Sequence, residues 1–162
     1  MANQIQVAEL GGAEVLQEVD QTIGAPPAGH VRVAIEASGV NFIDVYFRTG
    51  LYPRPLPFVS GLEGAGQILE VGPDVERFVV GQRVAWSSVP GSYATEILAP
   101  AESLISVPNS VSSEVAAAAM LQGMTAHYLV HACRETKPGE TALVHAAAGG
   151  VGQLHLSPGL PE

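Results

Sequence analysis

The sequence predicts a mostly β fold that gives way to helices toward its C-terminus. Glycine and proline number 18 and 12 among the 162 residues and separate short apolar stretches, which is typical of strands joined by tight turns. Residues 109–140 are instead rich in alanine, which favours helix. Hydrophobic residues make up 47% of the chain and charged residues 14%, so the chain can build a core. The length suffices for one domain, or for one domain and part of another.

The N-terminal part alternates weakly between apolar and polar residues and predicts three strands. A Gly-Gly turn and a turn of sequence GAPPAG separate them. The expected strands are 5–10, 14–19 and 30–37, and the turns are 11–12 and 24–29.

A short helix is expected within 39–50, where Val40, Ile43 and Phe47 recur at helical spacing. Gly50 is suited to end this helix, because glycine readily adopts the left-handed conformation that follows a helix C-terminus. The next stretch, YPRPLPF, contains three prolines and predicts an extended loop.

Further glycine-punctuated stretches predict three more strands and complete a compact barrel or sandwich. The sequences VGPDV and VVGQR supply turns between them. These strands are expected near 64–71, 82–87 and 91–98.

The alanine-rich region predicts two helices. Ser112 is a suitable N-cap and Glu114 lies in the first turn, where the helix dipole favours an acidic residue. Gly123 is expected to break or kink the helix, and a second helix should run to about Arg134. Pro138 and the glycine after it then end the helical region.

A nearly continuous apolar stretch at 141–147 predicts a buried strand of the parallel type. It leads into Ala147–Gly152, which fits the pattern A-x-G-x-x-G. Glycines in such a loop allow backbone N–H groups to approach a pyrophosphate, although a plain turn has the same appearance. The acidic residue that should bind the ribose about 20 positions further on does not occur in this sequence.

Charge and composition exclude several function classes. The net charge is −9 with seven Lys and Arg, which argues against binding nucleic acid or an anionic membrane. No apolar run is long enough for a transmembrane helix and the N-terminus lacks the features of a secretory signal. Cys133 is the single cysteine, so an intrachain disulfide cannot form and a cytoplasmic location is expected.

The order of five sequence blocks resembles the zinc-independent quinone oxidoreductases, the ζ-crystallin-like branch of the medium-chain dehydrogenases. The blocks are GVNFIDVYFRTGLYP (39–53), GLEGAG (61–66), VGQRV (80–84), LQGMTAHYL (121–129) and GETALVHAAAGGVG (139–152), and the resemblance covers about residues 5–154.

The resemblance implies two domains with NADPH in the cleft between them. Residues 1–111 should form a chaperonin-10 (GroES)-like barrel, and residues 112–154 the start of an NAD(P)-binding Rossmann domain. The family pattern stops near Leu154, because Ser157 replaces a family glutamine and two prolines follow it. Residues 155–162 are therefore expected to form a tail outside the family fold. The glycine loop should then lack its helix, and the 141–147 strand should keep exposed edges.

The same resemblance implies a site without zinc. The helix start reads Val-Asn-Phe rather than a Cys-His pair, and the position of the family's Gly-His-Glu reads Gly-Leu-Glu. One cysteine cannot supply a four-cysteine zinc lobe. His127 and His131 could chelate a metal from one helix face, but a solvated or capping role is favoured for them. His145, in the apolar stretch, is expected to be a core histidine.

By resemblance, Asn41 and Tyr46 are the catalytic residues and lie beside the nicotinamide. Asn41 could instead serve as a helix N-cap, and Tyr46 could be a packed aromatic residue. Gln122 and Thr125 are assigned to the cofactor, although Thr125 could simply bond back to the helix backbone. For Glu63 a structural turn contact is favoured over catalysis. Arg48 and Tyr52 could border the cleft, with a surface role favoured. The expected cofactor-binding residues of the loop are Ala148, Gly149, Gly150, Val151 and Gly152.

Two functions are expected from this reading. The first is hydride transfer from NADPH to a quinone or a related electrophilic alkene or carbonyl, without a metal. The second is a non-catalytic barrel module with a structural or partner-binding role. The oligomeric state stays open: family members often form a homodimer through their cofactor domains, but this chain largely lacks that domain.

Overall fold

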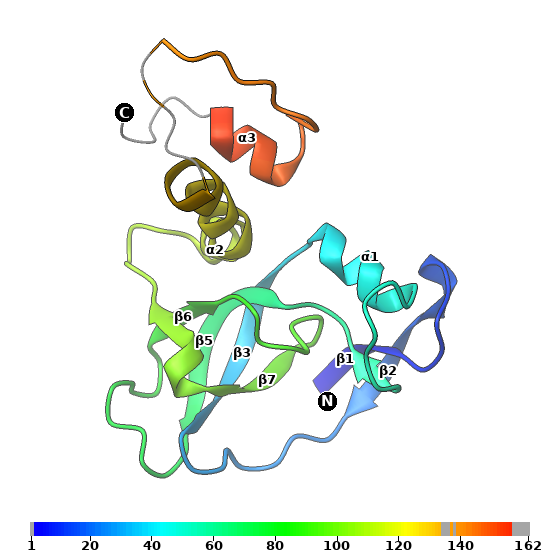
Figure 1. Cartoon of the computed structure of the whole chain (residues 1–162). Coiled ribbons are helices and arrows are strands. Elements are labelled where there is room, and N and C mark those ends of the chain that lie inside the picture. Colours follow the sequence, from blue (N-terminus) through cyan, green and yellow to red (C-terminus); the bar gives the residue numbers. More distant parts are fainter. Residues whose placement is uncertain (1, 134–136, 138, 157–162) are drawn as a thin grey trace.

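The computed structural model describes residues 2–133, 137 and 139–156. Within them the chain forms two antiparallel sheets, with helices above the larger one (Figure 1). The smaller sheet has the order β2-β1-β4 and comprises β1 (Ala2–Val7), β2 (Leu16–Gln21) and β4 (Phe58–Val59). The larger has the order β7-β3-β5-β6-β8 and comprises β3 (His30–Gly39), β5 (Glu63–Val71), β6 (Arg83–Trp86), β7 (Glu96–Pro100) and β8 (Leu104–Ser106). Short 3₁₀ turns, Ala13–Val15 and Ala101–Ser103, precede β2 and β8.

The main core lies on one face of the five-stranded sheet. Val31 and Val33 on β3, which lies between β7 and β5, are both fully buried and, two residues apart, point to the same side. Trp86 on β6 joins them, and its indole N–H donates to Ser92 Oγ at 2.8 Å. The alternation that predicted the strands therefore reports which face is buried.

The predicted mostly β, GroES-like fold is confirmed, but the two sheets do not close into a barrel. The expected strand over 91–98 is confined to β7, and β4 and β8 were not predicted. Gly91, with φ of +98°, turns the chain before β7, and the N–H of Tyr93 donates to Ser60 O in the preceding loop at 2.9 Å. The stretch before β7 is therefore a loop, which pairs with β1 through an isolated β-bridge between Gln4 and Ala94.

Helix α1 (Phe42–Arg48) confirms the short helix predicted between β3 and the proline loop. Asn41 is its N-cap residue, and the Asn41 backbone N–H donates to Asp44 Oδ2 at 3.0 Å. Gly50 follows the C-cap with φ of +80°, as expected for a glycine that ends a helix.

Helix α2 (Ser113–Tyr128) begins as predicted, with the Ser112 hydroxyl accepting from Val115 N–H at 3.3 Å. The predicted break at Gly123 is wrong, because α2 runs straight through that residue. Strong helix formers flank Gly123, and α2 packs across β3 and β5, which offsets the cost of about 1 kcal/mol for one glycine in a helix. A π-helical turn, Leu129–Cys133, follows, and Arg134 and Pro138 lie outside the described residues.

The C-terminal segment differs from the prediction in two respects. Residues 141–147 form no strand: the segment is irregular and turns at 145–148. The glycine loop, in contrast, does lead into a helix, α3 (Gly150–Leu156), which packs against α2 (Figure 1). His155 and Leu156, which were assigned to the tail, belong to α3, and residues 157–162 lie outside the described residues.

In the part of the chain that the structure describes, no helix combines the length and apolar character needed to cross a membrane.

Candidate functional site

A cavity of about 810 Å³ lies between the start of α1, the second half of α2 with its π-helical turn, and the segment that leads into α3. Most of its wall is apolar, and the polar side chains of Asn41 and Gln122 belong to it. Its lining consists of Val40, Asn41, Phe42, Val45, Gln122, Leu129, Val130, residues 142–146 and residues 149–152.

Asn41 and Gln122 form a hydrogen-bonded pair at the wall of this cavity. Asn41 is buried, with 7% of its surface exposed. Its side-chain Oδ1 accepts from Gln122 Nε2 at 3.3 Å, and the same Nε2 donates to Val40 O at 3.2 Å. The structure thus brings together two residues that lie 81 positions apart in the sequence.

Glu63 supports this pair from beneath. It is fully buried at the start of β5, and it accepts from Asn41 Nδ2 at 2.7 Å and from the Leu121 backbone N–H of α2. Burial raises the pKa of the Glu63 carboxyl, against the opposing effect of these hydrogen bonds. The expected turn contact is wrong in its location, because Glu63 starts a strand and links β5 to both α1 and α2.

Tyr93 extends the polar cluster and was missed by the sequence analysis. Its hydroxyl donates to Asp44 Oδ2 at 2.8 Å, the atom that also accepts the Asn41 backbone N–H. Burial, with the hydrogen bond to Asp44, raises the pKa of the Tyr93 hydroxyl. Sequence spacing carried no signal for this contact, which joins residues 49 positions apart.

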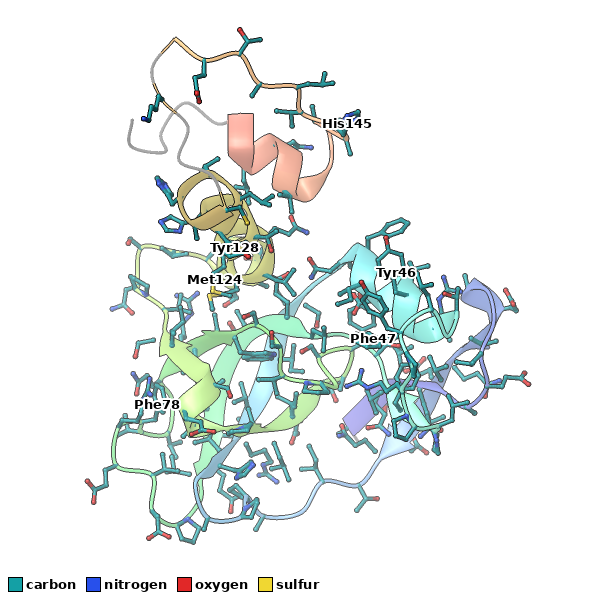
Figure 2. The ribbon with its side chains drawn as sticks, in the orientation of Figure 1. Tyr46, Phe47, Phe78, Met124, Tyr128 and His145 are labelled. Carbon is teal, nitrogen blue, oxygen red and sulfur yellow. The ribbon has the colours of Figure 1, made fainter. Side chains whose placement is uncertain are left out.

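Tyr46 lies outside the cavity lining. Its ring packs against Phe42 and Tyr52, with centroid separations of 5.3 and 5.2 Å, and Figure 2 shows Tyr46 on α1. The structure therefore places Tyr46 in an aromatic cluster. Arg48, at the end of the same helix, donates to Gly11 O at 3.0 Å and holds the loop before β2.

The glycine loop lines the cavity next to Gln122. Gly149, Gly150, Val151 and Gly152 line it, whereas Ala148 does not and its carbonyl accepts from Gln153 Nε2 at 2.6 Å. A Cβ at Gly150 would lie 1.9 Å from Gln122 Oε1, and one at Gly152 would lie 2.5 Å from Ala146 O. At Gly152 the contact is with backbone, so glycine is required there, whereas a side chain at Gly150 would require the end of the Gln122 side chain to move.

Thr125 and the histidines are placed elsewhere. The Thr125 hydroxyl donates to Leu121 O at 2.7 Å, the backbone bond considered as its alternative role. The rings of His127 and His131 stack at 4.3 Å, and among the described residues no group of three possible metal ligands occurs. His145 is exposed (Figure 2), so its prediction as a core histidine is wrong, because no strand forms around it.

These observations define a GroES-like domain and a glycine loop that line a shared cavity. Comparison with known proteins identifies the family to which the chain belongs. The alcohol dehydrogenase GroES-like domain model matches residues 27–109. A quinone oxidoreductase from Pseudomonas aeruginosa is 48% identical over 154 residues, covering 94% of this chain and 47% of that protein. A 2-haloacrylate reductase from a Burkholderia species is 44% identical, covering 89% of this chain and 45% of that protein. The crystal structure of Escherichia coli quinone oxidoreductase complexed with NADPH aligns with a TM-score of 0.92 at 41% identity, covering 94% of this chain and 48% of that one.

The chain belongs to the alcohol dehydrogenase GroES-like domain family. Its predicted kinship with the quinone oxidoreductases of the medium-chain dehydrogenase superfamily is confirmed. The chain spans about half the length of the curated relatives it matches.

Proposed function

We propose that this chain supplies the substrate side and the first phosphate loop of an NADPH-dependent quinone oxidoreductase. The observation that carries the proposal is that the Asn41–Gln122 pair and residues Gly149–Gly152 line one and the same cavity. Relatives named as quinone oxidoreductases, one of them solved with NADPH, support it. The relative named as a 2-haloacrylate reductase supports the wider substrate class of electrophilic alkenes.

The residues present fit a dinucleotide. The backbone of Ala146 and Ala147 leaves no room for a side chain at Gly152, so the loop offers backbone there to the cavity that it lines, as a loop that binds pyrophosphate requires. When bound, NADPH supplies the hydride that reduces the substrate. Gln122 and Asn41 offer polar atoms in the same cavity, and the side chains of Val40, Phe42 and Val45 give it an apolar wall.

The proposed reaction adds a hydride to one face of the substrate, and the oxygen that becomes negative takes a proton. No metal is part of this proposal, because zinc-dependent relatives place their ligands at positions that Asn41 and Leu62 occupy in this chain. Thr125 and Ala148 remain in the proposed site by resemblance, as does Tyr46 in its catalytic role. The homodimer stays open, and the cytoplasmic location stays a prediction.

The test is a titration of the purified chain with NADPH, followed by nucleotide fluorescence. We expect saturable binding at sub-millimolar NADPH. Gly152→Ala should weaken it by about tenfold or more, because its Cβ would displace the loop backbone at Ala146. Gly24→Ala is the matched control, since a Cβ there meets no atom within 4 Å. Absence of any change in fluorescence at millimolar NADPH would exclude catalysis by this chain alone.

A non-catalytic, partner-binding module is the second candidate. Leu143, which is 83% exposed, and Leu129, which is 43% exposed, present apolar surface around the cavity, a feature of interaction sites. Saturable NADPH binding that Gly152→Ala weakens would favour the enzyme over this alternative.

A further inference from the structure

Glu63 is part of the site, but the hydride transfer proposed above gives it no role. It is fully buried below the cavity, and both of its oxygens accept hydrogen bonds, one from Asn41 Nδ2 at 2.7 Å and the other from the Leu121 N–H. An ionised carboxylate only accepts hydrogen bonds. An ionised Glu63 therefore requires a hydrogen-bond donor, and not an acceptor, next to each of its two oxygens.

This property determines how the neighbouring amides are oriented. Because the Asn41 Nδ2 faces Glu63, the Asn41 Oδ1 faces away and accepts from Gln122 Nε2 at 3.3 Å. Gln122 Nε2 also donates to Val40 O at 3.2 Å, so both bonds keep the nitrogen of Gln122 on that side. The Gln122 Oε1 is then directed at the glycine loop, where a Cβ on Gly150 would lie 1.9 Å from it.

We propose that Glu63 is a positioning residue that fixes the orientation of the Asn41 and Gln122 amides, so that Gln122 presents a hydrogen-bond acceptor to ligands in the cavity. The ligand group that fits this acceptor is an N–H donor, such as the carboxamide of a nicotinamide ring. The choice of ligand rests on the proposed function, whereas the orientation of the two amides does not.

Glu63→Gln separates this role from a merely structural contact. A glutamine keeps the size of the side chain but offers one acceptor and one donor. If the glutamine oxygen keeps the bond to Leu121 N–H, its NH₂ group faces the Asn41 Nδ2. Two donors then meet, and the Asn41 side-chain amide must flip so that its Oδ1 accepts from the glutamine. The flipped Asn41 would present its Nδ2 to the Nε2 of Gln122. The Gln122 amide must therefore flip as well, and its Nε2 loses the bond to Val40 O. A single substitution thus changes two amides, one of which it does not contact.

The first measurement uses the side-chain amide NMR signals of the ¹⁵N-labelled chain without ligand. We expect Glu63→Gln to shift the signals of both Asn41 and Gln122 while the backbone spectrum stays folded. Glu96→Gln is the control, because Glu96 pairs with Arg32 on the sheet at 3.6 Å, and it should shift neither. A shift confined to Asn41, or no shift at all, would overturn the proposal.

A measurement on the wild-type protein covers the case in which Glu63→Gln does not fold. The Asn41 side-chain NH₂, buried and bonded to Glu63, should exchange its hydrogens at least about tenfold more slowly than that of the exposed Asn109. Equal exchange rates would mean that the Asn41 amide is not held, and would overturn the proposal without any variant.

The ligand is tested with NADP⁺ and its 3-acetylpyridine analogue. The analogue carries an acetyl group in place of the carboxamide, so it keeps the carbonyl oxygen but lacks the N–H donor. The wild type should bind NADP⁺ roughly tenfold more tightly than the analogue, and Glu63→Gln should bring this ratio close to one. The ring-less 2′-phospho-ADP-ribose should bind both proteins equally. An unchanged ratio would overturn the assigned ligand. If none of the three binds the wild type, the proposed function fails, and the NMR measurements still decide the role of Glu63.

Discussion

Leu104 and Leu143 are the same residue type, but their surroundings in the folded chain are opposite. Leu104 begins β8, pairs with Trp86 of β6 and is fully buried. Leu143 lies in the apolar stretch before the glycine loop and is 83% exposed. The stretch before the glycine loop was predicted as a strand and β8 was not, yet within the described residues only β8 has a neighbouring strand to pair with.

The difference shows which structures this sequence can form locally. A strand satisfies its backbone hydrogen bonds only through another strand, and none pairs with residues 141–147 within the described part of the chain. A helix satisfies its bonds within itself. Helix α3 therefore forms after the glycine loop and packs on α2, whereas the stretch before the loop stays irregular. The glycine loop thus has a helix after it but no strand before it.

The largest expected effect comes from the core of the five-stranded sheet. Leu104→Ala should lower the free energy of unfolding by about 2–5 kcal/mol, because it leaves a cavity among buried side chains. Urea denaturation followed by Trp86 fluorescence measures it, since Trp86 lies in the same core. A loss below about 1 kcal/mol would show that Leu104 is not tightly packed in the core of the sheet.

A smaller effect concerns the pH dependence of stability at the junction between the two regions. Burial raises the pKa of Glu63 above its ordinary value of 4.5, and the nearby charge of Asp44 acts in the same direction. The folded protein therefore binds this proton more tightly than the unfolded chain. The resulting stability is fully present at low pH and is lost as the pH rises from 4.5 through the folded pKa.

Glu63→Gln removes this titration, so the free energy of unfolding should fall less steeply with pH than in the wild type. Denaturation curves between about pH 4 and 8 test this. Parallel curves for the wild type and Glu63→Gln would contradict the assigned burial of Glu63. Tyr93, which faces Asp44 in the same cluster, titrates above this range and does not add to the slope.

Much of the fold could be predicted because its signals are local. The period-two alternation around Val31 and Val33 located β3, the cap at Ser112 located the start of α2, and Gly50 located the end of α1. The break at Gly123 failed because packing against the sheet outweighs a single weak propensity.

The site could be predicted only in part, because its contacts join distant parts of the chain. Asn41 and Gln122 came from the family resemblance, and the structure brings them together. The polar contacts of Tyr93 and Glu63 depend on the folded sheet and span 49 and 58 positions to Asp44 and Leu121. One signal for Glu63 was available, since a charged residue between small apolar neighbours in GLEGAG is unusual in a buried strand.

The smallest expected effect comes from Leu143, and it sharpens the comparison most directly. Leu143→Ala, the same substitution as at Leu104, should change the free energy of unfolding by less than about 0.5 kcal/mol, because an exposed side chain has little contact area to lose. The same urea denaturation measures it. A loss above about 1 kcal/mol would mean that residues 141–147 pack as the predicted buried strand, in this chain or against a second copy of it. Repeating the measurement at two protein concentrations separates these cases, since stability that depends on association rises with concentration.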